Sequence, residues 1–332
     1  MVFNTFNNFG NISRKSALYI PPTPVIGQIL IVGAGAGAAS GGGGGGAVLY
    51  NSTFTFIRGT TYNITIGAGQ TGSISNNGNP PASYYQTAPS SSISYGSTTI
   101  TALGGGSGGI NQGPARANGV SGGCGGGGCS YGSGLTNGGS STQTTPSGFI
   151  AYGNAGGSNG AITSPNYPCG GGGGAGSVGG AGTSSKSGDG GAAKMINIIP
   201  TNNTGFTPLY NVFGGGGGGS MFVSGGAIGV GGSATDSSGN SRKVGGDGGS
   251  NVTLTGFNGL ANTGSGGGGG NNNYSGGNGA NGVVIIAVPY GSEGTAIGHA
   301  WNNTSVGYSS GYNNTSFWVF TNTTVGTCKY VA

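Results

Sequence analysis

Contiguous blocks of glycine constrain this chain more than any other feature of its sequence. Glycine makes up 86 of the 332 residues and is concentrated in near-pure runs, with no fixed repeat. The longest runs are 41–46, 125–128, 170–174, 214–219 and 266–270. Glycine costs more backbone entropy to order than any other residue and buries almost no side-chain surface, so these runs cannot build a conventional hydrophobic core. Either they are disordered, or they pack backbone against backbone.

Composition favours the ordered alternative. Only 4% of the residues are charged, so the self-repulsion that keeps many disordered chains open is missing, and 9% are aromatic. Collagen is excluded because it needs glycine at every third position and abundant proline, whereas this chain has 13 prolines. The remaining ordered form is polyglycine II, an extended helix with three residues per turn. Its N–H and C=O groups must bond to neighbouring helices when they are buried.

Short apolar segments at both ends of the glycine-rich region predict β-strands. Residues 29–32 and 283–288 are continuous apolar runs, and residues 62–66 alternate between apolar and polar. We therefore predict a mainly β and irregular fold with almost no α-helix, in which short strands clamp a bundle of polyglycine II helices. The predicted parts are an extended N-terminal arm over 1–26, a glycine-rich domain over 27–290 and a C-terminal β extension over 291–332.

The chain is poor in residues that support catalysis or bind a cofactor. Residues 29–38 match a strand followed by the G-x-G-x-x-A dinucleotide fingerprint, but six glycines follow where the fingerprint needs a helix. The only histidine is His299, and we interpret the three aspartates as turn residues: Asp189, Asp236 and Asp247. We expect no enzymatic activity, no catalytic residues, no cofactor and no metal site.

Two residue types invite covalent modification. Cys124 and Cys129 enclose four glycines, and a disulfide between them is sterically conceivable because glycine loops bend freely. Unpaired, small buried side chains are an equal alternative. N-glycosylation sequons are densest near the C-terminus, at Asn303, Asn314 and Asn322. Because the N-terminus lacks a signal-peptide pattern, unmodified polar surface is the leading interpretation of these sequons.

Charge and hydropathy argue against two classes of partner. The net charge of +5 comes from nine scattered basic residues against four acidic ones, whereas nucleic-acid binding usually needs a concentrated basic surface. The longest apolar stretches fall far short of the roughly 20 residues that a membrane-spanning helix needs. We expect no nucleic-acid partner and no membrane insertion.

The two ends of the glycine-rich region resemble a known type of domain. Its opening resembles the segment 29–35 followed by a glycine block, an apolar strand and the sequence RGTTYNITIGAGQTG over 58–72. Its closing strand resembles NGANGVVIIAVPY over 278–290. Such glycine-rich, polyglycine II domains occur in phage tail-fibre adhesins, in structural proteins of large DNA viruses and in some receptor kinases. The resemblance implies packed polyglycine II helices and a virion-surface or adhesive role, without catalytic residues.

These observations predict an extracellular, virion-surface structural protein (a fibre, spike or minor capsid component) whose loops bind a host-surface glycan or protein. Loops on a rigid scaffold commonly carry binding, and tyrosine rings give rigid contact area. The candidate binding residues lie in the polar spacers 74–101 and 140–168 and are Tyr84, Tyr85, Tyr95, Tyr152 and Tyr167. The alternative is a filament- or shell-forming assembly protein joined by exchange of terminal strands. Its partners would be other virion structural proteins or copies of itself.

Overall fold

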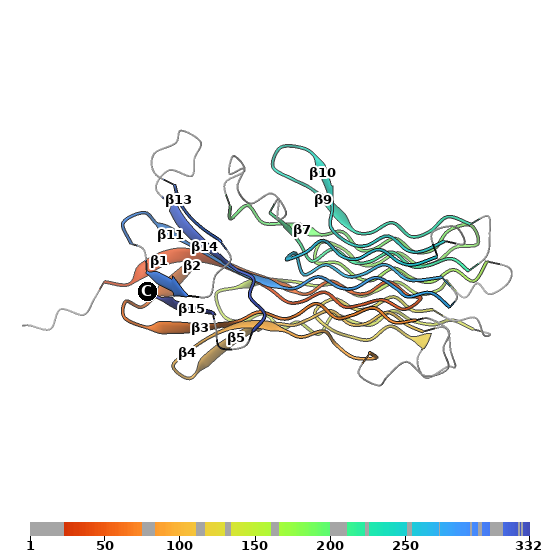
Figure 1. Cartoon of the computed structure of the whole chain (residues 1–332), viewed down its shortest axis with the longest axis horizontal. Coiled ribbons are helices and arrows are strands. Elements are labelled where there is room, and N and C mark those ends of the chain that lie inside the picture. Colours follow the sequence, from red (N-terminus) through yellow and green to blue (C-terminus); the bar gives the residue numbers. More distant parts are fainter. Residues whose placement is uncertain are drawn as a thin grey trace, which may run out of the picture.

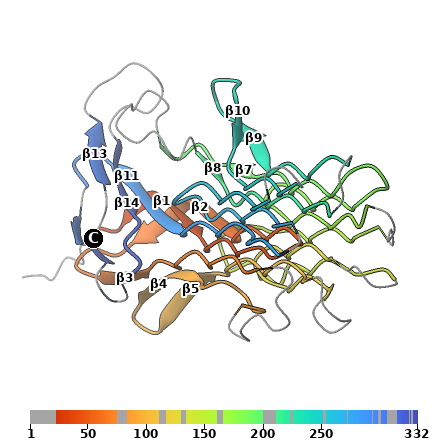
Figure 2. The same cartoon turned by 45° about the vertical axis from the view of Figure 1, so that its right-hand side comes forward.

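The computed structural model shows an elongated protein with a β-sandwich at one end and a bundle of extended, glycine-rich segments at the other (Figure 1, Figure 2). Every regular element in the described part of the chain is a β-strand, as the sequence predicts. The structure describes residues 23–74, 84–110, 117–129, 134–160, 166–199, 211–222, 226–250, 254–271, 273–292, 294–297, 301–305, 315–324, 326 and 328–332.

The larger sheet contains the two strands that the sequence predicts most strongly. These strands, around 29–32 and 283–288, pair antiparallel in the middle of the sheet, with Ile29 opposite Ile286. The strand order is β13-β14-β11-β1-β2-β6. The bounds are β1 (Val25–Val32), β2 (Val48–Phe56), β6 (Ile150–Tyr152), β11 (Val283–Pro289), β13 (Trp301–Ser305) and β14 (Thr315–Phe320).

The smaller sheet joins the C-terminal segment to the start of the chain. Its order is β12-β15-β3-β4-β5. The bounds are β3 (Thr61–Thr65), β4 (Ser91–Tyr95), β5 (Thr98–Ala102), β12 (Thr295–Ile297) and β15 (Cys328–Val331). Since β14 pairs with β11 and β15 pairs with β3, the segment after residue 290 supplies strands to both sheets of the sandwich.

Two further pairs of short strands lie along the bundle. The first pair is β7 (Lys194–Met195) with β8 (Val212–Phe213), and the second is the hairpin of β9 (Ser233–Thr235) and β10 (Ser241–Lys243). Figure 2 shows the β9–β10 hairpin projecting from the side of the bundle.

The continuous apolar run of β1 is explained by burial of both faces of the larger sheet. Ile29 and Ile31 pack into the core that both sheets share. Leu30 and Val32 point to the opposite face and pack in a second core with Phe213 of β8. A strand that alternates between two buried faces has no polar positions, so its sequence reads as an unbroken apolar run.

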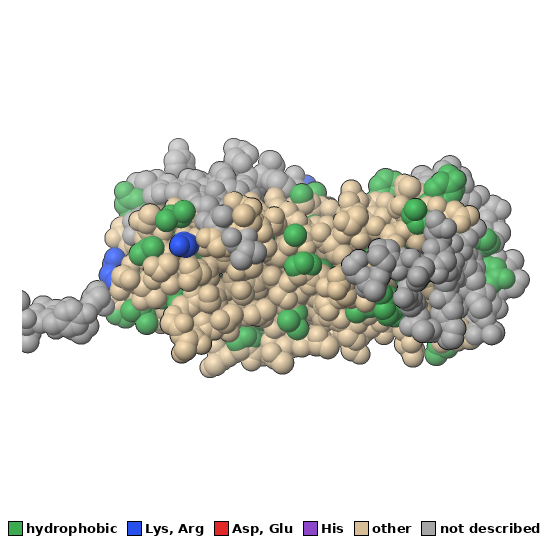
Figure 3. All heavy atoms as spheres, turned by 60° about the horizontal axis from the view of Figure 1, so that its bottom comes forward, with side chains coloured by type: hydrophobic (Ala, Val, Ile, Leu, Met, Phe, Trp, Pro, Cys, Tyr) green, Lys and Arg blue, Asp and Glu red, His purple; other side chains and the backbone are tan. Residues whose placement is uncertain are grey.

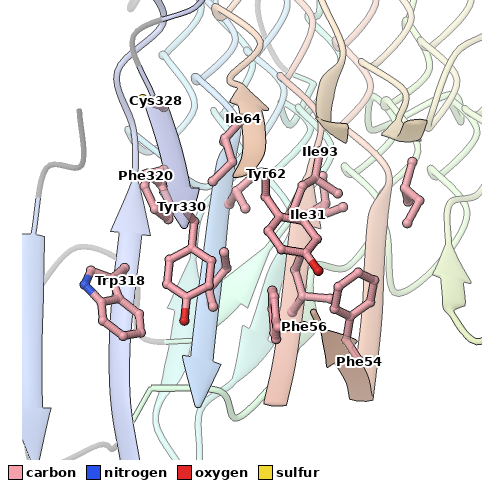
Figure 4. Packing of buried hydrophobic residues seen from close by; sticks show 14 of the residues in the cluster. Ile31, Phe54, Phe56, Tyr62, Ile64, Ile93, Trp318, Phe320, Cys328 and Tyr330 are labelled. Carbon is pink, nitrogen blue, oxygen red and sulfur yellow. The ribbon is translucent and has the colours of Figure 1, made fainter. Parts of the chain in front are cut away.

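Aromatic side chains fill the core between the two sheets (Figure 4). The rings of Phe56 and Tyr330 are 5.4 Å apart between centroids, and those of Trp318 and Tyr330 are 5.1 Å apart. The Tyr62 hydroxyl accepts a hydrogen bond from the Ile57 N–H at 2.8 Å, which satisfies its polar end. These edge-on and tilted contacts join strands from the beginning and the end of the chain.

The first glycine block donates its N–H groups to three neighbouring segments in turn. Residues 41, 44 and 47 donate to the segment 103–109, residues 42 and 45 to 170–173, and residues 43 and 46 to 264–267. The N···O distances lie between 2.7 and 3.1 Å. Carbonyl groups of the same block accept hydrogen bonds from residues 33–36, 124–127 and 217. The hydrogen bonds therefore repeat every three residues, and the block is surrounded by six other segments.

Only glycine fits in the middle of this arrangement. A Cβ atom placed at any residue of the block 41–46 would lie 2.0–2.4 Å from a backbone oxygen of another segment. Such a clash can be relieved only by moving a whole segment, because backbone atoms cannot rotate away as a side chain can. The unbroken run of six glycines in the sequence is the consequence of contact on all sides.

Substitution of a central glycine tests this packing. In Gly44→Ala the new Cβ would lie 2.3 Å from the Cys124 carbonyl oxygen, so we expect a loss of about 3 kcal/mol or more in the free energy of unfolding. Gly96→Asn is the matched control, because Gly96 lies in a turn with φ of 52°, meets nothing within 4 Å, and asparagine tolerates this conformation. Denaturant unfolding measures both variants, and equal stability of the two would contradict the packing model.

Candidate functional site

The protein has two ends of different character. At the sandwich end, β1 begins at Val25 and the C-terminal Ala332 donates its N–H to the Thr60 carbonyl. The bundle segments turn back at the opposite end, which we call the distal end (Figure 1). Residues with exposed or half-buried side chains next to these turns form the distal surface, namely Ile74, Tyr85, Leu135, Tyr167, Phe222 and Tyr274.

Tyr84 lies at the distal end but is buried. Its hydroxyl group lies 3.2 Å from the Gly108 carbonyl oxygen, to which it donates, and 3.4 Å from that of Gly37. Burial raises the pKa of Tyr84 well above its usual value, which keeps the hydroxyl protonated as a donor. The side chain therefore ties two glycine-rich segments together, whereas Tyr85 beside it is half-buried and its hydroxyl donates to the Asn118 carbonyl at 2.5 Å.

Tyr167 and Phe222 form an aromatic pair at the distal end. Their ring centroids are 5.8 Å apart, and the rings meet edge to face. Tyr167 has a φ of 42°, a conformation that is uncommon for a bulky residue and is kept only where its surroundings hold it. The Phe222 N–H donates to the Asn166 carbonyl, which links the two chain segments that carry the rings. The pair is thus a fixed aromatic feature of the distal surface.

The other two predicted tyrosines lie near the sandwich. Tyr95 packs against Tyr62 with ring centroids 4.8 Å apart. Tyr152 lies on β6, where the Lys194 ammonium group is 4.5 Å from its ring centroid. The structure therefore does not bring the five predicted tyrosines to one face. Three lie at the distal end, and Tyr95 and Tyr152 lie in the strands.

The disulfide joins Cys129 to Cys169, with Cα atoms 4.5 Å apart, so of the two alternatives left open by the sequence the bond between Cys124 and Cys129 is wrong. Those two cysteines lie on one extended segment, where each residue advances the chain by about 3 Å and keeps them apart. Cys169 lies on the neighbouring segment, because Gly170 donates its N–H to the Gly128 carbonyl. Cys124 is a buried free thiol, and burial raises its pKa to about 12.

Asp189 and Asp247 bond to backbone donors of a neighbouring segment, so the interpretation of both as turn residues is wrong. Asp189 Oδ1 accepts the Val230 N–H at 2.8 Å, and Asp247 Oδ1 accepts the Gly231 N–H at 2.7 Å. Their other oxygens pair with Lys186 and Lys243. The sequence repeats GDGG at 188–191 and 246–249, which is the signal that would have identified the shared role.

Asp236 does occupy a turn, as the sequence predicts. Its Oδ1 atom accepts the N–H groups of Ser238 and Asn240, both at 2.9 Å, within the β9–β10 hairpin. Arg242 donates to its Oδ2 atom at 2.6 Å, and this hydrogen bond is the largest cause of the lowered pKa of Asp236. The carboxylate therefore fixes the hairpin turn and is already fully occupied by partners in the hairpin.

The remaining predicted positions are the three asparagines of the C-terminal sequons and His299. Asn303 lies on β13, Asn322 is exposed with its Oδ1 accepting the Thr324 N–H, and Asn314 lies outside the described residues, as does His299. Within the described ranges, no three His, Cys, Asp or Glu residues are grouped closely enough to hold a metal ion. Those ranges also contain no helix long and apolar enough to cross a membrane.

Comparison with known proteins identifies the family. A family model described as a glycine-rich domain matches residues 13–289, which is most of the chain. The chain belongs to the glycine-rich domain family. Neither the curated proteins nor the solved structures contain a match to this glycine-rich domain protein. The match ends at Pro289, the last residue of β11, so the strands β12–β15 that complete the sandwich lie beyond it.

Mapping of the cysteines tests the disulfide. The unfolded, unreduced protein should expose two reactive thiols, those of Cys124 and Cys328, and Cys124→Ala should expose one. A bond between Cys124 and Cys129 would instead give three thiols in Cys124→Ala. Alkylation followed by mass spectrometry counts them.

The double substitution of Cys129 and Cys169 by serine should lower the free energy of unfolding by about 2–4 kcal/mol, as measured by denaturant unfolding.

Proposed function

We propose that this glycine-rich domain protein is a structural component of a virion surface, such as a fibre, spike or minor capsid protein. It is attached through its sandwich end and presents its distal end to a host surface. The observation that carries this proposal is the separation of the two ends: the described chain begins and ends at the sandwich, and the bundle turns lie at the far end (Figure 1). The proposal assigns no catalytic role and no cofactor.

The bundle supplies the rigid spacer that such a role requires, and we propose that its segments are polyglycine II helices. The hydrogen bonds of residues 41–47 repeat every three residues, as a helix with three residues per turn would make them. Each buried segment is bonded to several neighbours, so bending one segment would break hydrogen bonds to others. Loops on so stiff a scaffold are held in fixed positions relative to one another.

The distal surface has the chemistry of an adhesive face. Hydrophobic side chains gather at this end on the face shown in Figure 3, and no Lys, Arg, Asp or Glu is seen among the described side chains there. Leu135 is 59% exposed, Ile74 42% and Tyr274 41%. Aromatic rings, aliphatic groups and amides suit contact with a glycan or a protein surface, because they offer contact area at a small cost in side-chain entropy.

The disulfide supports an exposed location. Disulfides persist in oxidising surroundings and are rare in proteins that stay in a reducing cytosol. The bond between Cys129 and Cys169 links two bundle segments next to the distal surface. This position is consistent with the proposal that the distal end is the part of the protein that faces the exterior of the particle.

Accessibility on intact particles tests the proposed orientation. A short epitope inserted between Gly134 and Leu135 should bind antibody on intact particles, whereas the same epitope added after Ala332 should bind only after the particles are disrupted. Immunogold electron microscopy gives both readouts, and antibody bound at the distal epitope should reduce attachment to host cells at least tenfold. Absence of the protein from particles, or the reverse pattern of accessibility, would overturn the proposal.

A second candidate is assembly of copies through their sandwich ends. Large apolar side chains of the described residues are exposed in the sandwich, namely Ile26, Ile57, Ile150, Tyr290 and Ile297. In the described part of the larger sheet, β6 and β13 are edge strands, and each leaves one row of backbone groups without a partner strand. Such edges accept an added strand from another chain. The segment before Val25 is the proposed donor, and β1 itself stays in the sheet.

Truncation separates the two candidates. If copies exchange the N-terminal segment, a chain that begins at residue 23 should keep its cooperative thermal unfolding but sediment as a monomer, while the full chain sediments as an oligomer. Sedimentation velocity at matched concentrations measures the difference. The same state for both chains would argue against strand exchange and leave the display function standing.

A further inference from the structure

A groove runs along the side of the bundle, apart from the distal surface. It has a volume of about 220 Å³ and lies between the segment that leaves the β9–β10 hairpin and the segment 257–260. Two backbone hydrogen bonds join these segments, from the Leu260 N–H to the Val244 carbonyl at 2.7 Å and from the Phe257 N–H to the Asp247 carbonyl at 2.9 Å. We call it the side groove, and its lining includes Lys243, Val244, Asp247, Phe257, Asn258 and Leu260.

The side groove has an apolar base with an exposed aromatic ring beside it. Val244 is buried and Leu260 packs against it. The Phe257 side chain is 53% exposed. An exposed phenylalanine loses contact with water when a flat apolar surface covers it, which favours binding of such a surface.

The polar groups around the ring are held in place by the backbone. Lys243 Nζ is paired with Asp247 Oδ2 at 2.5 Å, and Asp247 Oδ1 accepts the Gly231 N–H. Asn258 Oδ1 accepts the Asn278 N–H at 2.8 Å, so its amide nitrogen remains as the donor toward a ligand. The groove thus combines fixed donors and acceptors with one aromatic face, the arrangement expected of a small-ligand site.

We infer that the side groove binds one ring of a neutral sugar. The Lys243–Asp247 pair cancels its own charge, so the groove favours groups that both donate and accept hydrogen bonds, which is the chemistry of sugar hydroxyls. One face of a pyranose ring carries C–H groups that stack on an aromatic ring such as Phe257. The volume is smaller than the about 300–1,000 Å³ of pockets for drug-sized ligands and suits a single ring of a longer chain.

Saturation-transfer NMR of the full chain with methyl glycosides tests the inference. The probes are the methyl glycosides of glucose, galactose, mannose and N-acetylglucosamine, with methyl glucuronide as the charged comparison. At least one neutral glycoside should bind, with saturation transferred most strongly to its ring C–H protons. Phe257→Ala should weaken that binding at least tenfold and Lys243→Met several-fold, while Phe257→Trp should retain it.

The matched control is Val178→Ala, which removes an exposed apolar side chain that belongs to neither the side groove nor the distal surface and should leave glycoside binding unchanged. Because Phe257 is exposed, Phe257→Ala should unfold at the same temperature as the parent chain. The inference is overturned if no neutral glycoside binds, if Phe257→Ala binds as well as the parent, or if the glucuronide binds more tightly than every neutral probe. Loss of binding in Tyr274→Ala but not in Phe257→Ala would assign the sugar to the distal surface.

Discussion

Direct hydrogen bonding between closely packed backbones is the interaction on which this structure depends. The block 41–46 donates to three segments and accepts from three others, and a Cβ at any of its residues would collide with a backbone oxygen. Each such bond contributes only about 0.5–1.5 kcal/mol, so stability requires many of them made together. The absence of side chains, which would exclude a conventional core, is what allows the bundle to form.

The sandwich provides what the bundle lacks, a hydrophobic core that fixes the positions of the segments. The strands β1 and β11 are buried on both faces; β1 leads directly into a glycine-rich segment, and β11 directly follows one. Aromatic rings from β2, β3 and β15 close the core between the sheets. The apolar sandwich sets the register, because a shift of one residue would turn buried side chains to the opposite face, and the glycine segments extend that register to the distal end.

Because backbone hydrogen bonds and the sandwich core stabilise the fold, the side chains on the surface of the bundle are available for recognition. The distal surface and the side groove are built from residues next to turns and from the spacers between glycine blocks, where a side chain has room. Asp189 and Asp247 lie on the surface of the bundle, and each carboxylate accepts a backbone N–H of an adjoining segment. A bundle surface whose backbone N–H groups are bonded in this way offers fewer free backbone groups to a neighbouring molecule. Contacts with such a molecule are therefore made mainly by side chains.

The sequence by itself determined the all-β class, the strands around 29–32, 62–66 and 283–288, and the need for glycine to pack as backbone, because each follows from local periodicity or from the missing side chain. Only the tertiary structure decided which segments are neighbours. It paired Cys129 with Cys169, buried Tyr84, separated Tyr95 and Tyr152 from the distal surface, and joined Phe257 with Lys243 in one groove. Glycine blocks are almost identical in sequence, so they carry no local signal for their partners, and contacts across the bundle are fixed by the strands that lead into it.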